Sequence, residues 1–475
     1  MTKFKLNATI GWLSVALILA YASLGCDFLD PTAVKNPQTS EDSLREGGTG
    51  ATGPFLNGVV FRYSDAIEDL AAYVDVVSDN YDNVATFISP ATDFPLQIRS
   101  DDLTLNHTTS GPYFEIQELR ALADFTINGV IPNDALATPD DLAEALFYRG
   151  MANLLCGENF QAAPIAEGGA ALSAAQLLQL ALDDFSAALE ASANGDIPTR
   201  IHLVKARAYR LLGDKVNAAT EANLALAGTA NFVFSAQFDA ANNINAAFNF
   251  SVSRALNDVQ PLPRLDFLDP KYLARDAGIP SIKMEEAHLI LAEVALANGD
   301  NGGAVQRLVD VINLANSRPR VSFIDVDPRS QRPQGGTVQA SAAAAAIDGL
   351  IQPRGTSLVQ VPTISATSLN AAAVGALTNP VEIFRALYLA RQEIFFYEGR
   401  RMSDLGIRLP MMELEIDSNP IINAGDNGTA VLVPSYIPAS DGLDQFTIQG
   451  DNTVISFDMN QILADNRVSP FSMPF

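Results

Sequence analysis

Cysteine, histidine and tryptophan are all scarce in this chain of 475 residues. The two cysteines exclude a small scaffold that is held together by several disulfides. Three histidines, His107, His202 and His288, leave little material for a histidine-rich zinc centre. The single tryptophan, Trp12, lies close to the N-terminus, so a binding site further along the chain has no indole ring to use.

Basic residues are also few. The chain has 30 Lys and Arg against 55 Asp and Glu, a formal net charge of −25 and a sequence pI near 4.4. An acidic surface repels phosphate backbones, so the sequence predicts no nucleic-acid partner. The 48% of hydrophobic residues is enough for a large core, in one big domain or in two of ordinary size.

The clearest local signal lies at the N-terminus. Lys3 and Lys5 precede an apolar run over residues 10–22, which Ser23-Leu-Gly-Cys26 follows. The run is short for a transmembrane helix, which needs about 20 residues, so we predict a signal peptide over residues 1–25. Small residues before Cys26 resemble a lipobox and predict lipidation of Cys26, although Ser23 stands where leucine is usual. A plain signal peptide or an uncleaved anchor is the alternative. Cleavage would also remove Trp12, and the polar residues 26–39 would form an extended tether.

An internal repeat organises the middle of the chain. The segment HLVKARAYRLLGD at 202–214 aligns with HLILAEVALANGD at 288–300, and a second amphipathic helix follows each. Both copies have small residues where the two helices of a tetratricopeptide hairpin cross, and a glycine that ends the first helix. A third, fainter copy has Gly150, Gly157 and Ala162 at the same relative spacing. The aligned small residues are Ala206 with Ala292, Gly213 with Gly299 and Ala218 with Ala304.

The spacing of the copies predicts the fold class. They stand much further apart than the roughly 34 residues of a tandem array, so we expect a mainly α protein of tetratricopeptide-like helix pairs with long loop-rich insertions and few short strands. Residues 40–475 are predicted to form one domain. Its parts are a helix-pair scaffold at about 140–228 and 281–316, further helices at about 40–81, 113–128 and 381–399, loops at about 82–112, 229–280 and 317–380, and a tail over 419–475 with short strands at most.

Four segments resemble a known family in their order and spacing. CDFLDP at 26–31 looks like the family's start, and SDN at 78–80 is similar to a turn that follows its first helix. Residues 143–165 are similar to an aromatic helix followed by a Gly-Asp-x-Pro-Leu turn, with extra residues inserted. RQEIFFYEGRRMSDL at 391–405 is similar to an arginine- and glutamate-rich helix that ends in Glu-Gly-x-Arg before Asp-Leu. These segments together resemble the RagB/SusD family of outer-membrane nutrient-binding lipoproteins.

The resemblance implies a function and partners. It implies a SusD-like, lipid-anchored protein of the outer membrane that is exposed at the cell surface and attached to the membrane only through the lipid on Cys26. Such a protein captures oligosaccharides, or peptides in some members, without catalysis, and delivers them to a SusC-like TonB-dependent transporter. Two alternatives stay open: a tetratricopeptide-type scaffold protein without a small ligand, and a glycoside hydrolase. No cofactor is implied.

Aromatic residues in the predicted loops are the candidate ligand platforms, because sugars stack on aromatic rings. Without tryptophan, tyrosine and phenylalanine would have to supply this contact. The expectation of a glycan ligand is therefore less strongly favoured over that of a peptide ligand than is usual in the family. The candidate ligand-binding residues are Tyr81, Phe87, Phe94, Phe267, Tyr272 and Phe323.

Other motifs favour structural interpretations. Gly48-x-Gly50-x-x-Gly53 fits a dinucleotide fingerprint, but a polar segment precedes it and Pro54 follows, so a break in the first helix is favoured. Cys156 ends an apolar helix and is predicted to be a buried apolar residue. The many carboxylates make no ordered catalytic set. Arg391, Arg400 and Arg401 are predicted to form ion pairs that dock their helix onto the repeats. We predict no metal site, since Asp325, Asp327, Asp417 and Asp426 could bind calcium but form no EF-hand loop.

Overall fold

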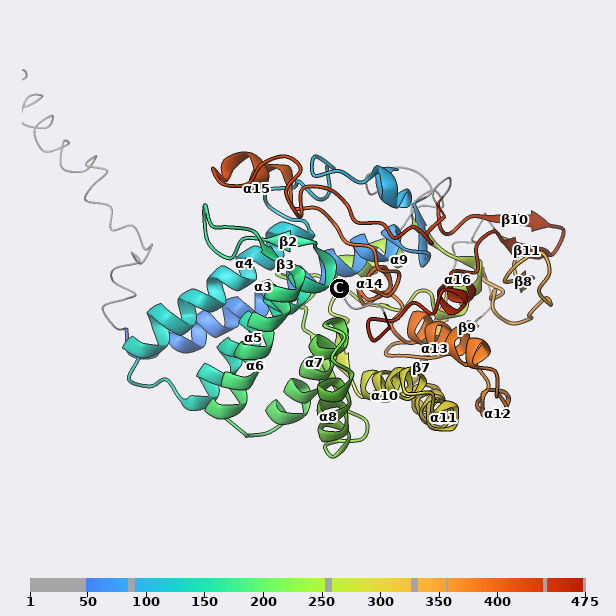
Figure 1. The fold of residues 1–475 in the computed structure, drawn as a ribbon, viewed down its shortest axis with the longest axis horizontal. Coiled ribbons are helices and arrows are strands. Elements are labelled where there is room, and N and C mark those ends of the chain that lie inside the picture. The colour runs from blue at the N-terminus through green and yellow to red at the C-terminus, as the bar shows by residue number, and fades with distance from the viewer. Residues whose placement is uncertain are drawn as a thin grey trace, which may run out of the picture.

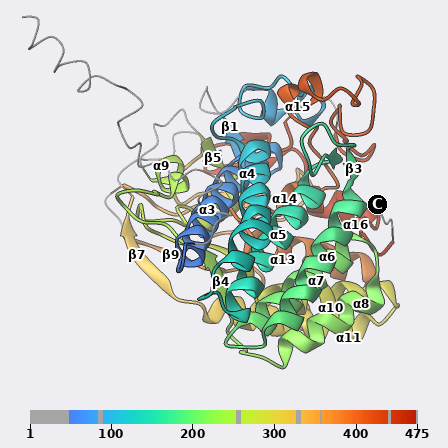
Figure 2. The same cartoon turned by 90° about the vertical axis from the view of Figure 1, so that its left-hand side faces the viewer.

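Antiparallel helix pairs make up most of the fold. The computed structural model describes residues 48–475 except 84–89, 253–258, 326–331, 356–357, 439–441 and 473–475. Successive helices pack against one another in a row that continues from the first helix to the last long one (Figure 1, Figure 2). The long helices are α3 (Thr52–Val77), α4 (Pro112–Phe125), α5 (Pro139–Asn159), α6 (Ala174–Ala191), α7 (Ile197–Leu211), α8 (Lys215–Leu226), α10 (Glu285–Ala297), α11 (Asn301–Ser317) and α13 (Pro380–Ile394).

Short elements fill the connections between these helices. In Figure 1 many of them gather above and to the right of the helix row. The short helices are α9 (Ala246–Ser251), α12 (Ala371–Gly375), α14 (Arg401–Asp404), α15 (Glu413–Ser418) and α16 (Met459–Asp465), with 3₁₀ turns η2 (Pro90–Asp93), η3 (Pro95–Gln97), η5 (Ile131–Asn133) and η6 (Pro263–Leu268) and one π-helical turn, η4 (Thr126–Val130).

Strands are short and form small separate sheets. Four antiparallel pairs are β1 (Tyr81–Asn83) with β5 (Val259–Pro261), β2 (Ala162–Ala163) with β3 (Leu172–Ser173), β4 (Val233–Ala236) with β6 (Ile279–Lys283), and β7 (Arg320–Ile324) with β9 (Leu358–Pro362). A three-stranded sheet has the order β10 (Phe446–Gln449), β11 (Asn452–Ile455), β8 (Thr337–Gln339), and β11 and β8 are parallel. The predicted fold class, mainly α with few short strands, is confirmed.

The two strong repeat copies have matching turns. Gly213 and Gly299 follow α7 and α10 with φ of 75° and 76°, a backbone conformation that glycine adopts without a steric penalty. The next residue in each copy, Asp214 or Asp300, caps the following helix by accepting a hydrogen bond from a backbone N–H three residues later. The small residues Ala206, Ala218, Ala292 and Ala304 are all fully buried, as the repeat predicted.

The third repeat copy was wrong in part. Gly150 does lie at a close helix crossing, because a Cβ there would come within 2.6 Å of the Phe185 ring on α6. Gly157, however, does not end the helix, since α5 continues to Asn159. A Cβ at Gly157 would lie 2.9 Å from the Ala174 carbonyl, so this glycine permits close approach of the next helix. Ala162 lies in β2, because a short hairpin separates α5 from its partner.

Several predicted boundaries also shift. The described part of the first helix begins at Thr52 and ends at Val77, and α13 ends at Ile394, before a turn in which Tyr397 has a φ of 57°. The predicted tail of strands and loops contains the helix α16, which packs on α13. Most of the buried apolar side chains belong to one connected core that extends from Val59 to Val468. Within the described residues, no helix is long and apolar enough to cross a membrane.

Candidate ligand face

Three of the predicted ligand aromatics, Tyr81, Phe267 and Tyr272, are buried, and the two tyrosines have structural roles. Tyr81 is 1% exposed, donates its hydroxyl to Asp269 (2.8 Å), and stacks on Phe396. Tyr272 is also 1% exposed and donates its hydroxyl to the carbonyl of Tyr397 (2.7 Å). Their rings have no face open to solvent, so in this structure they anchor the loops onto the C-terminal motif and do not form a platform for a ligand.

The remaining candidates lie in different places. Phe94 is half-buried between two 3₁₀ turns, and Phe323 is half-buried on β7. Phe267 lies on η6 and lines a hollow described below. Phe87 and Cys26 lie outside the described residues. The structure therefore does not bring the five described aromatics together into one platform.

A hollow of about 410 Å³ opens between η6, the segment 320–370 and α13. Its size suits a small oligosaccharide or part of one, since ligand pockets are usually about 300–1,000 Å³. It combines an apolar floor with hydrogen-bonding groups, the composition of a sugar or peptide site. The lining residues are Arg264, Phe267, Arg320, Val338, Ala340, Ile347, Asp348, Gly349, Leu350, Thr367, Ser368, Leu369, Asn370, Arg385 and Leu389.

Arginines give the hollow its electrostatic character. Arg264 is buried, and its guanidinium lies 3.8 Å from Glu393 and 3.9 Å from Asp458, at the limit of an ion pair. Burial lowers the pKa of Arg264, and its Nε–H has no acceptor among the described residues. Arg385 is held by two hydrogen bonds to Asp458, of 2.7 and 3.0 Å. The hollow thus offers one buried and two more exposed cationic donors, Arg264, Arg385 and Arg320, to a ligand that carries oxygen acceptors.

Glu393 fixes the wall of the hollow from behind. It accepts hydrogen bonds from the Thr367 hydroxyl (2.6 Å) and from the backbone N–H and hydroxyl of Ser368 (2.7 and 2.6 Å). Its oxygens are occupied by these donors. Asp348 is then the one carboxylate among the lining residues, whereas glycoside hydrolysis by the usual route needs two flanking carboxyl groups.

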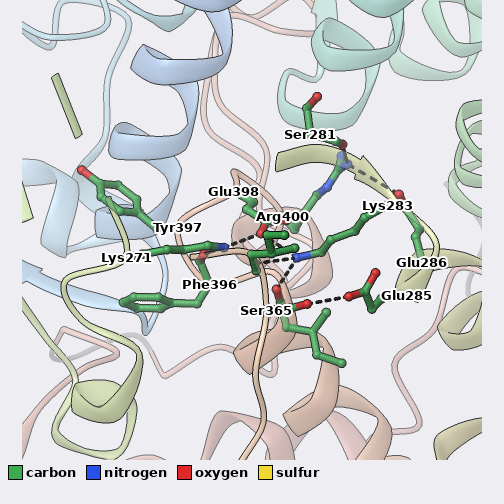
Figure 3. A network of polar contacts seen from close by, with 12 residues as sticks. Lys271, Ser281, Lys283, Glu285, Glu286, Ser365, Phe396, Tyr397, Glu398 and Arg400 are labelled. Atoms are coloured by element: carbon green, nitrogen blue, oxygen red, sulfur yellow. Dashed lines mark hydrogen bonds and ion pairs between the residues drawn. The ribbon is translucent and has the colours of Figure 1, made fainter. Parts of the chain in front are cut away.

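A buried polar network lies at the centre of the fold (Figure 3). Glu398 accepts hydrogen bonds from Lys271 and from Lys283, the latter at 2.6 Å, and all three side chains are at most 3% exposed. Lys283 also donates to the carbonyl of Ile394 (2.6 Å). Burial lowers the pKa of Lys271 to about 8 although the Glu398 carboxylate opposes this shift. Through Lys271 and Lys283, the network joins the segment 229–280 and β6 to the turn after α13.

Arginines of the C-terminal motif dock it onto the helix row, as predicted. Arg391 pairs with Asp404 (2.8 Å), and Asp404 also receives Arg210 of α7 (3.1 Å). Arg400 lies 3.3 Å from Glu158 of α5. The nearby arginines hold the pKa of Asp404 below its usual value despite burial.

Two of the motifs that resemble the family meet in space. Arg401 of the C-terminal motif pairs with Asp79 of the SDN segment at 2.5 Å, and both side chains are buried. Gln392 donates to Asp79 (2.9 Å) and to Asn80 (3.1 Å). These motif residues therefore hold the fold together, and none of them lines the hollow.

Other candidate chemical groups have structural roles. Burial raises the pKa of the Cys156 thiol to about 12, so little reactive thiolate forms at neutral pH. His202 hydrogen bonds to Glu221 on the neighbouring helix (2.6 Å), and His288 lies at the equivalent place on α10. Asp325 pairs with Arg354 (2.8 Å), while Asp327 lies outside the described residues.

Sequence reasoning missed the polar residues of the hollow. Arg264, Thr367, Asn370 and Arg385 come from three separate segments, and no spacing along the chain links them. Their only sequence signal is the location of most of them in long insertions, which are often functional.

Comparisons with known proteins identify the fold. No family model and no curated protein matches the sequence. Among solved structures, a SusD superfamily protein of Bacteroides fragilis is 14% identical with a TM-score of 0.50, over 78% of this chain and 98% of its own. B. fragilis NanU is 11% identical with a TM-score of 0.52, over 78% and 91%. A Bacteroides vulgatus protein described provisionally as sugar-binding is 16% identical with a TM-score of 0.50, over 76% and 87%. The chain therefore has the fold of the SusD superfamily, and the resemblance seen in its motifs is confirmed at the level of the fold.

Proposed function

We propose that this protein is a non-catalytic, lipid-anchored surface protein that binds oligosaccharides and delivers them to a TonB-dependent transporter. The observation that carries the proposal is the hollow between η6, residues 320–370 and α13, with its ring, its hydroxyls and its arginines, of which Arg264 is buried. A structural neighbour provisionally described as sugar-binding supports the choice of ligand. A single lining carboxylate supports binding without hydrolysis.

The groups in the hollow suit a sugar. Arg264 offers an Nε–H without an acceptor, and Asn370 and Asp348 are exposed at the rim. Phe267 contributes an apolar surface, although it is only 7% exposed. An aromatic contact of this kind contributes about 0.5–1.5 kcal/mol. We therefore expect weak binding, with dissociation constants from roughly high micromolar to millimolar.

Calorimetry with a panel of neutral and acidic oligosaccharides and short peptides tests the proposal. We expect binding of at least one oligosaccharide, and we expect Phe267→Leu, which keeps an apolar side chain but removes the ring, to weaken it about three- to tenfold. Phe61→Leu, on an exposed phenylalanine of α3 that does not line the hollow, is the control and should bind normally. Equal affinity in both variants contradicts the site, and sub-micromolar affinity for a neutral oligosaccharide contradicts the reasoning from the missing tryptophan.

A peptide ligand is the second candidate, and one observation favours it. β7 and β9 form a two-stranded ribbon within the described residues, with Val321, Ile324 and Leu358 exposed on it. An extended peptide could pair with the open edge of such a ribbon through backbone hydrogen bonds. In the calorimetric panel, peptide binding that survives Phe267→Leu would identify this ribbon.

The transporter partner and the anchor rest on the motif resemblance and on the predicted lipidation of Cys26. The test is purification of the protein from the membranes of its own host in mild detergent. We expect a TonB-dependent transporter to copurify in about equal amount. Recovery of the protein alone, free of membranes, would overturn this part of the proposal.

A further inference from the structure

Three aspartates converge at the junction between the first loop and the C-terminal tail. Asp82 lies in β1, Asp93 ends η2, and Asp444 precedes β10. One carboxylate oxygen from each lies within 4.8 Å of the others. A cation shared by three carboxylates requires this separation, whereas three anions without a cation would repel one another.

Asp444 is the strongest indication of a ligand. Its residue is 2% exposed, and among the described residues no group outside the trio donates a hydrogen bond to either carboxylate oxygen; its polar neighbour is the carboxyl group of Asp82. Asp93 accepts one bond, from the backbone N–H of Asn83 (3.0 Å). A buried carboxylate normally has hydrogen bonds or a counter-charge, because its burial is otherwise very unfavourable.

Among the residues that the structure describes, no lysine or arginine forms an ion pair with the trio. Arg332 acts on Asp82 through space, but its guanidinium donates to Asp266 (2.8 Å) and to the carbonyl of Pro261 (3.3 Å). Burial, together with the neighbouring carboxylates, raises the pKa of Asp444 well above its usual value and that of Asp93 to about 7. The crowding of three carboxyl groups in one place is therefore unfavourable unless a cation joins them.

The backbone and the surface leave access to the trio. A Cβ at Gly442 would come within 2.8 Å of the Asp444 carboxylate and 3.3 Å of the Asp93 carbonyl, so glycine lets the chain pass beside the aspartates. A hollow of about 410 Å³, lined by Asp82, Asp444, Gln445, Phe446 and Ile448, opens beside them. It provides an entry path and room for water ligands, which a metal site with few protein ligands needs.

We propose that Asp82, Asp93 and Asp444 bind a divalent cation, calcium. Calcium prefers six to eight oxygen ligands in a flexible arrangement, so three carboxylates completed by water suit it better than the strict octahedron of Mg²⁺. The ion fastens the first loop to the tail. Its affinity belongs with weaker sites, with a dissociation constant of about 10⁻⁵–10⁻³ M.

The experiment measures melting of the purified protein in EDTA and in a calcium titration. Calcium should raise the melting temperature of the parent protein in a saturable way. Asp444→Asn should melt at least as high as the parent in EDTA, since an amide is easier to bury beside two carboxyl groups than a third carboxyl group is, and it should lose the calcium response. Asp93→Asn should weaken the calcium midpoint at least about tenfold. Asp101→Asn, at an exposed aspartate of the same loop whose one ion-pair partner among the described residues is Arg99 (3.1 Å), is the control and should respond fully.

Terbium gives an independent measure of the site, because this ion replaces calcium and its luminescence is excited through tyrosine. Calcium should displace it from the parent and from Asp101→Asn. Asp82→Asn should bind it more weakly, which keeps the test decisive if Asp444→Asn fails to fold. No calcium response, an equal response in every aspartate variant, or a response to Mg²⁺ alone would overturn the proposal.

Discussion

Replacing Glu398 by Gln should destabilise the protein more than most single substitutions. Glu398 is the anion shared by Lys271 and Lys283, and all three side chains are at most 3% exposed. Glutamine keeps the shape but leaves two buried ammonium groups without a counter-charge. Removing one partner of a buried ion pair costs about 3–5 kcal/mol, so we expect a loss of that size in the free energy of unfolding at pH 7.

The pH dependence of this loss follows from Lys271. Its pKa in the folded protein is about 8, below the ordinary 10.5, so the unfolded chain binds more protons between these values and stability rises with pH across them. Glu398 raises this pKa, so its removal lowers it further and moves the rise to lower pH. The gap between parent and variant should therefore narrow between pH 7 and pH 9.

Urea unfolding followed by circular dichroism at both pH values measures the effect. Glu382→Gln, on an exposed glutamate in the first turn of α13, is the matched control and should change stability by less than about 0.5 kcal/mol. Lys271→Met should be tolerated better than Glu398→Gln, because Lys283 and Glu398 then remain as a balanced pair. A loss below about 1 kcal/mol in Glu398→Gln, or a gap that widens at pH 9, would refute the reasoning.

Further predictions concern the scaffold, a buried acid and the anchor. Gly150→Ala should lower the free energy of unfolding by about 1–3 kcal/mol because the new Cβ meets the Phe185 ring. Gly58→Ala, whose Cβ would have its nearest neighbour at 3.4 Å, should raise the free energy of unfolding by up to about 1 kcal/mol, and thermal melting compares the two variants. Burial raises the pKa of Glu68 from 4.5 to about 8, so the contribution of this carboxyl group to stability falls as the pH rises between these values. Glu68→Gln should therefore stabilise the protein by at least about 1 kcal/mol at pH 8 but not at pH 4, as measured by urea unfolding at both pH values. Cys26→Ser should release the protein from membranes, and a mass spectrum that shows an unacylated mature N-terminus at another residue would contradict lipidation.

Local signals in the sequence were enough to predict the repeated helix pairs. Gly213-Asp214 and Gly299-Asp300 each combine a helix-ending glycine with a helix-capping aspartate, and both act within a few residues along the chain. The glycine at 157 looked the same in sequence, but its role depends on Ala174, which approaches it from the next helix. Spacing alone cannot distinguish a glycine that ends a helix from one that permits a close contact.

Contacts between distant segments explain what the sequence could not predict. Tyr81 and Tyr272 lie in predicted loops, yet Asp269 and Tyr397 bind their hydroxyls inside the core. The hollow and the aspartate trio likewise combine residues that lie far apart in the sequence. Docking of the C-terminal motif was predictable because a run of arginines next to acidic groups must find counter-charges when it is buried.

The position of Asp458 affects when the protein can begin to bind. Arg385 of α13, which lines the hollow, is held by Asp458. Asn460 of α16 donates a hydrogen bond to Gln392, which also lies on α13 (2.7 Å). The pairs from α5 to α8 can assemble from neighbouring segments while the chain is still emerging, since local contacts form first. The wall of the hollow that Arg385 and Gln392 support can form only after the residues around 458–460 are available to pack on α13. A chain whose C-terminal residues have not yet folded would therefore carry a folded helical framework but an unfinished hollow.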